Sequence, residues 1–93
     1  MESNSVYYLE EGVQVRREKF GLLFYDYRGP RLYFVPSQDL LGEDVFDGQH
    51  TSEAVVESVC LEHGWSRQLV RLRIHQVLTM LERKGLIHEQ LVC

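Results

Sequence analysis

The hydrophobic pattern of residues 20–35 predicts a β-hairpin. Two runs of aromatic and branched side chains, residues 20–26 and 31–35, flank the sequence Tyr27-Arg28-Gly29-Pro30, which is typical of a turn. Residues 13–17 alternate between apolar and polar side chains and predict a strand ahead of the hairpin. The short apolar segment 6–9 is open to three interpretations: a further strand, a flap over the sheet, or part of a flexible arm within residues 1–12.

Both faces of the predicted hairpin are apolar, because successive side chains of a strand point to opposite faces. On the first strand, Leu22 and Phe24 point to one face and Leu23 and Tyr25 to the other. On the second strand, Leu32 and Phe34 share one face, with Tyr33 and Val35 opposite. A hairpin with one face in water alternates apolar with polar residues. The second face of this hairpin therefore needs a cover as well.

Three helices are predicted after the hairpin. The first would begin at a Ser37 N-cap, with Asp39 in its first turn, and end at Gly48. The second would run from a Thr51 N-cap to Gly64, and the third from Ser66 to Gly85, with each glycine in the left-handed conformation that ends helices. Apolar residues recur at helical spacing in all three: Leu40, Leu41, Val45 and Phe46; Val55, Val56, Val59 and Cys60; Val70, Ile74, Val77, Leu78 and Leu81.

This order of elements predicts an α+β fold, because strands followed by helices place the helices on one face of an antiparallel sheet. We expect a winged helix-turn-helix-like domain with a three-stranded antiparallel sheet followed by three helices (βββααα). The 93 residues suffice for one hydrophobic core, so residues 1–93 are expected to form a single domain.

Composition and charge narrow the functional class. The chain is 44% hydrophobic and 26% charged, which is typical of a folded domain. A net charge of −4 and a pI near 5.5 argue against unselective binding to nucleic acid or to anionic membranes. Residues 1–5 lack the pattern of a secretion signal, and no apolar run approaches the ~18 residues that span a bilayer. We therefore expect a cytoplasmic protein without a membrane partner.

The sequence contains no pattern that predicts catalysis. Phosphate-loop, serine-hydrolase and metalloprotease motifs are absent, so we expect no enzymatic activity and no cofactor. Cys60 and His63 fall on one face of a predicted helix and only His75 could join them, whereas a structural zinc site needs four ligands. We expect no metal site, and we expect Cys60 to be a core thiol.

The arginines of the third predicted helix, Arg67, Arg71 and Arg73, leave three alternatives open. In a winged-helix regulator they would enter a DNA groove. They would otherwise form a solvated polar face, or a cationic groove that receives acidic side chains of a peptide. The overall negative charge favours the last two alternatives over DNA.

The second apolar face of the hairpin is also open to alternatives. Segment 6–9 or a symmetric dimer contact would cover Leu23, Tyr25, Tyr33 and Val35, and in the second case the chain would be a homodimerising adaptor. Alternatively, the free edge of the third strand would pair with an extended peptide, with side-chain pockets selecting the sequence.

The chain resembles the PqqD-like peptide chaperones, which are RiPP recognition elements. The resemblance covers about residues 13–88 and rests on the sheet-first order and on three segments: Phe20-Gly21-Leu22-Leu23-Phe24-Tyr25, Arg31-Leu32-Tyr33-Phe34 and Leu81-Glu82-Arg83-Lys84-Gly85-Leu86-Ile87. Within that group, the hairpin and the Ser-x-x-Leu-Leu sequence that follows it are most like those of the mycofactocin-system chaperones, MftB.

The resemblance implies a non-enzymatic role. Members hold the leader segment of a ribosomally made precursor peptide as an added strand along the third strand, against the third helix, and present it to a radical S-adenosylmethionine (SAM) maturase. Carried over to this chain, the peptide-binding surface falls on Arg31, Leu32, Tyr33, Phe34, Val35, Arg67, Val70, Arg71, Ile74 and His75.

Overall fold

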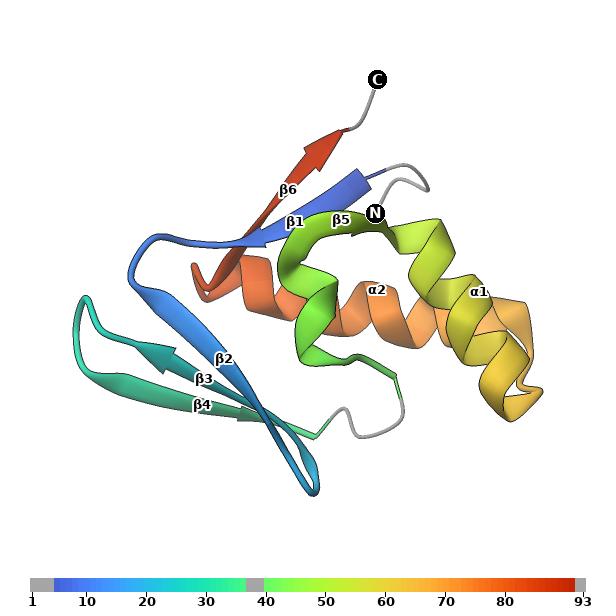
Figure 1. Cartoon of the computed structure of the whole chain (residues 1–93), viewed down its shortest axis with the longest axis horizontal. Helices are drawn as coiled ribbons and strands as arrows, with labels where there is room; N and C mark the ends of the chain where they lie inside the picture. The colour runs from blue at the N-terminus through green and yellow to red at the C-terminus, as the bar shows by residue number, and fades with distance from the viewer. Residues whose placement is uncertain (1–4, 37–39, 92–93) are drawn as a thin grey trace.

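The computed structural model describes residues 5–36 and 40–91. In chain order the elements are β1 (Ser5–Leu9), β2 (Val13–Glu18), β3 (Gly21–Asp26), β4 (Arg31–Val35), a 3₁₀ turn η1 (Glu43–Phe46), β5 (Asp47–Thr51), α1 (Ser52–His63), α2 (Arg67–Arg83) and β6 (Ile87–Leu91) (Figure 1). The strands form two antiparallel three-stranded sheets, in the orders β5-β1-β6 and β2-β3-β4. The fold is α+β, but the prediction of a single three-stranded sheet is wrong, because the chain contains a second sheet.

The prediction of three helices is wrong. Where the first helix was expected, the described residues form only η1 and β5; its proposed N-cap region, residues 37–39, lies outside the described ranges. Val45 and Phe46 of this segment are buried all the same, and the Phe46 ring packs edge-on against Phe24 with centroids 5.5 Å apart. A single 3₁₀ turn therefore suffices to place these side chains in the core.

Gly48 lies within β5 rather than at the end of a helix. Its φ is +77°, and a Cβ at this position would lie 2.1 Å from Cε1 of Tyr8. The pairing of β1 with β5 is irregular between Val6 and Tyr8. Glycine is needed here because the strand is irregular and the tyrosine ring lies directly against its backbone.

The two remaining helices lie where the sequence predicted them. The Thr51 hydroxyl accepts a hydrogen bond from the Ala54 N–H at 3.2 Å, and Ser66 caps α2 in the same way. Gly64 and Gly85 have φ values of +68° and +73°, as expected for glycines that follow helices. No helix among the described residues is both long and apolar enough to cross a bilayer.

Segment 6–9 belongs to β1, so the strand is the interpretation that the structure supports. β1 is the central strand of its sheet, with Val6 and Tyr7 buried. The core gathers side chains from both sheets, η1 and both helices. The β2-β3-β4 sheet contributes its inner face, and α2 contributes its apolar stripe: Val13, Leu22, Phe24 and Val35, with Val70, Ile74, Leu78 and Leu81.

Candidate functional site

β4 is an edge strand. Within residues 5–36 and 40–91 it pairs only with β3, so its other edge has no neighbouring strand (Figure 1). The direction of its backbone groups follows from the register of the whole sheet. The Tyr27 N–H donates to the Gly12 carbonyl at 2.8 Å, immediately beyond the pair Val13–Asp26.

Hydrogen-bonding direction alternates along an antiparallel strand. Because the Tyr27 N–H points to β2, the backbone groups of Tyr25 and Leu23 also point to β2. The backbone groups of Phe24 point the opposite way, toward Tyr33 of β4. Tyr33 and its alternate neighbours therefore bond to β3. Leu32 and Phe34 direct their N–H and C=O groups to the free edge.

The side chains of Leu32 and Phe34 lie on the outer face of the sheet and are 63% and 49% exposed. The register pairs Leu32 with Tyr25 and Phe34 with Leu23. The prediction that Leu23 and Tyr25 share a face with Tyr33 and Val35 is therefore wrong. The side chains of Tyr33 and Val35 pack toward the core. Nor does β1 cover the outer face, because Leu32 and Phe34 stay exposed there while Tyr7 of β1 is buried in the core.

The C-terminal end of α2 lies against the hairpin. The Arg28 guanidinium donates to the Gly85 carbonyl at 2.7 Å. It also donates to the Asp26 carboxylate, and this hydrogen bond lowers the pKa of Asp26. Lys84 Nζ lies 4.9 Å from the centroid of the Tyr33 ring. These contacts hold the inner side of β4 beside the end of α2.

A groove follows one side of α2. Its larger part, of about 420 Å³, is lined by His75, Gln76, Thr79, Met80, Arg83 and Lys84. A second part of about 310 Å³ is lined by Gln68, Arg71, Leu72 and His75. These described lining residues include cations and no carboxylate. Lys84 connects the larger part with Tyr33, so the groove adjoins β4.

The residues predicted to bind peptide fall into different environments. Val35, Val70 and Ile74 are buried in the core and can only support the surface from beneath. Arg31 and Tyr33 interact through Nη1 and the phenolic oxygen at 3.4 Å. Leu32 and Phe34 are exposed on β4, and His75 is exposed on α2, where it lines the groove.

Arg67 and Arg71 are directed toward α1. Arg67 Nη1 donates to Glu53 at 2.9 Å, and Arg67 also pairs with Glu57. Arg71 Nη2 donates to Glu53 at 3.0 Å. Either guanidinium would have to leave these ion pairs to bind a DNA phosphate or a peptide carboxylate.

Most of the C-terminal half of the groove was not predicted from the sequence. Thr79 and Arg83 follow His75 at four-residue intervals, which places all three on one side of α2. That spacing was available in the sequence. What the sequence did not show was that β4 lies beside this end of the helix.

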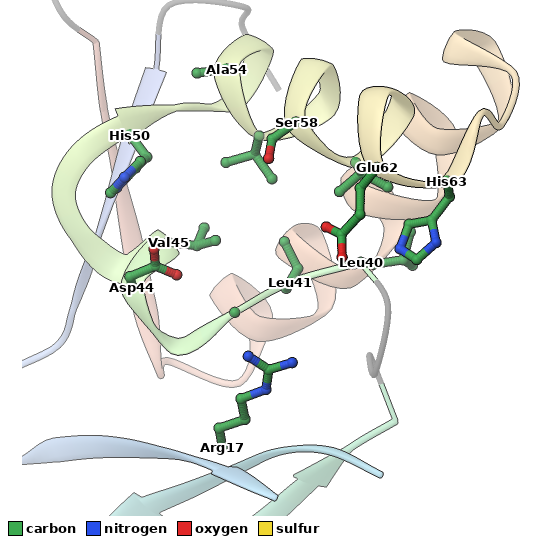
Figure 2. A pocket seen from close by; sticks show the side chains of 13 residues that line it. Arg17, Leu40, Leu41, Asp44, Val45, His50, Ala54, Ser58, Glu62 and His63 are labelled. Atoms are coloured by element: carbon green, nitrogen blue, oxygen red, sulfur yellow. The ribbon is translucent and has the colours of Figure 1, made fainter. Parts of the chain in front are cut away.

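A separate cavity of about 270 Å³ lies between β2, η1 and α1 (Figure 2). Arg17 approaches it from the sheet, while Asp44 and Glu62 line its other sides. Of its two histidines, His50 contacts Asp47 at 3.1 Å and His63 stacks on Trp65. The described residues contain no group of three His, Cys, Asp or Glu side chains that could hold a metal ion. Cys60 is half-buried and packs against the core.

A comparison with models of protein families shows to which family the chain belongs. The model of the peptide chaperone MftB family matches residues 6–88. The chain belongs to the MftB peptide chaperone family. The match runs from β1 into β6 and thus includes β4 and α2, and it confirms the resemblance to MftB seen in the sequence. Membership supports a chaperone role. Comparisons with curated proteins and with solved structures give no match.

Proposed function

We propose that this chain binds the leader segment of a ribosomally synthesised precursor peptide as a fourth strand along β4. It would present that peptide to a radical SAM maturase of mycofactocin or related RiPP biosynthesis, without catalysing a reaction itself. The free edge of β4, with the backbone groups of Leu32 and Phe34 directed away from β3, carries the proposal. Family membership supports a peptide as the ligand. We expect the encounter in the cytoplasm.

Backbone pairing alone would bind the peptide weakly. Leu32 and Phe34 offer four backbone groups, and each hydrogen bond contributes about 0.5–1.5 kcal/mol net. The total of about 2–6 kcal/mol is below the ~8 kcal/mol of a micromolar complex, before the cost of ordering the peptide is counted. Side-chain contacts must therefore contribute a large part of the affinity and the sequence preference.

The α2 groove provides such contacts. Alternate side chains of an added strand would point to the inner side of the sheet, toward α2. There, Met80 and Thr79 offer apolar contact, while Lys84 and Arg83 offer positive charge. We therefore expect inward-facing leader residues to be apolar or acidic. Val35, Val70 and Ile74 would support this surface from the core, and Arg67 and Arg71 would contribute through the packing of α2 on α1.

Proline substitutions on β4 test the proposal. Proline is tolerated on an edge strand where the lost N–H faces outward. Leu32→Pro and Phe34→Pro should each weaken binding of a mycofactocin-type leader peptide by about two- to twelvefold, which corresponds to the loss of one backbone hydrogen bond, while the fold persists. Leu32→Ala and Phe34→Ala are the matched controls, because they shorten the same side chains but keep the N–H.

Val35→Pro tests the assigned backbone direction. It removes a donor that bonds to β3, so it should destabilise the hairpin itself. Wild-type peptide affinity in both folded proline variants, Leu32→Pro and Phe34→Pro, would exclude strand addition at this edge.

A further inference from the structure

The outer face of the β2-β3-β4 sheet has a polar side and an apolar side. The polar side comes from β2: Gln14, Arg16 and Glu18. Arg16 forms an ion pair with Glu18 at 2.7 Å, and its guanidinium carbon lies 5.7 Å from the Tyr25 ring centroid. The apolar side comes from β3 and β4, and it reaches the free edge of β4.

Two further aromatic rings extend the apolar side. Phe20 packs edge-on against Phe34 with centroids 4.7 Å apart, and Tyr27 stacks on Tyr25 at 6.1 Å. Phe20 and Tyr27 are 57% and 62% exposed. We call this surface the outer patch; it consists of Phe20, Leu23, Tyr25, Tyr27, Leu32 and Phe34.

The outer patch is large enough to form part of a stable interface. Its four most exposed side chains offer on the order of 400 Å², given that a fully buried aromatic side chain covers about 150–250 Å². A patch of this size is often functional on a monomer, but a stable interface needs about 800 Å² from each partner. The outer patch alone therefore supplies about half of such an interface.

The additional area would come from the peptide. A strand added at the free edge of β4 would project alternate side chains onto the outer face, directly beside Leu32 and Phe34. Resting on the proposed function, we infer that the outer patch and the outward-facing side chains of the bound leader together form the docking surface for the maturase. The maturase would meet this surface with an apolar surface of its own. It would bind the loaded chaperone more tightly than the empty one, because the leader supplies part of the contact.

A double variant on β3 separates this surface from the peptide site. Leu23→Thr with Tyr25→Thr removes apolar area one strand away from the free edge and retains residues that favour strands. Leu61→Gln with Leu69→Gln is the control, since these leucines are 78% and 51% exposed on α1 and α2. Both proteins are assayed for affinity for a labelled mycofactocin-type leader, and for affinity for the radical SAM maturase with and without that leader.

The double variant should bind the leader within twofold of wild type, while the loaded complex binds the maturase at least tenfold more weakly. The control should match wild type in both assays. Wild type should bind the maturase at least tenfold more tightly when loaded. Tyr25→Thr alone replaces the double variant if circular dichroism shows that the latter is unfolded.

The other outcomes overturn the inference in distinguishable ways. Unchanged maturase affinity in the double variant would exclude the outer patch as a docking surface and leave the proposed function intact. A parallel loss of leader affinity would assign the patch to the leader. A wild-type dimer that the double variant abolishes in sedimentation would assign the patch to a second copy. Absence of leader binding by wild type would overturn the proposed function itself, and the inference with it.

Discussion

The ammonium group of Lys84 lies 4.9 Å from the centroid of the Tyr33 ring. This cation–π contact connects the residue that follows α2 with the inner face of the strand whose outer edge is free. A contact of this kind contributes about 0.5–1 kcal/mol at an exposed site. It therefore matters less for the stability of the whole fold than for the spacing between β4 and α2.

Lys84→Ala should lower the free energy of unfolding by about 0.5–1 kcal/mol and weaken leader binding severalfold. The second effect is expected because the groove loses a cation and Tyr33 loses a contact. Urea denaturation and fluorescence anisotropy with a labelled leader measure the two effects. Lys84→Arg is the control that keeps the charge and should retain most of both. Full leader affinity in Lys84→Ala would place the peptide away from this end of α2.

The ion pairs between α1 and α2 are expected to stabilise the helix pair only slightly. Glu53 accepts hydrogen bonds from Arg67 and Arg71. Because these groups are exposed, Glu53→Gln should lower the urea midpoint by a small amount that shrinks further in 1 M salt. Glu62→Gln on the same helix is the control, since Glu62 forms no ion pair within the described part of the chain. A loss that is independent of salt would show that Glu53 acts through packing rather than charge.

Two glycines with similar backbone angles should respond differently to alanine. Gly48 and Gly64 have φ values of +77° and +68°, but only at Gly48 would a Cβ collide with a neighbour, the Tyr8 ring at 2.1 Å. Gly64→Ala should cost about 1–2 kcal/mol through backbone strain alone. Gly48→Ala should cost about 1–3 kcal/mol more, because the ring must also move. Equal losses of unfolding free energy in urea denaturation would mean that the Tyr8 ring moves aside at no cost.

The pKa of Glu82 predicts a pH dependence of stability. Burial raises this pKa above its ordinary value, and the neighbouring Glu89 raises it further. The folded state therefore binds the proton more tightly than the unfolded chain does. The resulting stabilisation is fully present below the ordinary pKa of a glutamate, and it is lost as the pH rises through the raised folded-state pKa.

Glu82→Gln removes this titration. The free energy of unfolding of Glu82→Gln minus that of wild type should therefore be larger at pH 7 than at pH 4, which means that the variant is relatively more stable at pH 7. Urea denaturation at both pH values measures the difference. A difference that stays constant between pH 4 and pH 7 would contradict the expectation.

Local signals were sufficient for the hairpin, for β2 and for the two α-helices. Thr51 and Ser66 cap the helices, and Gly64 and Gly85 follow them, because capping depends on a few neighbouring residues. Strands β5 and β6 could not be predicted in this way. The sequence Asp47-Gly48-Gln49-His50-Thr51 shows no apolar alternation, and it is extended because it pairs with β1, some forty residues earlier.

The candidate site was only partly predictable for the same reason. The composition of β4 was sufficient to predict a strand, but the exposure of Leu32 and Phe34 depends on how β4 pairs with β3. Likewise, the helical spacing of Arg67 and Arg71 was visible in the sequence. Their carboxylate partners lie on another helix, and their pairing became apparent only from the packing of α1 on α2.

Amide hydrogen exchange along β4, followed by NMR with and without a mycofactocin-type leader peptide, tests strand addition most directly. In the free protein the amides of Tyr33 and Val35 should exchange slowly, because they bond to β3, while those of Leu32 and Phe34 exchange quickly. Saturating leader should slow exchange at Leu32 and Phe34 specifically. If these two amides keep exchanging quickly while the leader is demonstrably bound, the peptide does not pair with β4 and the proposed binding mode is contradicted.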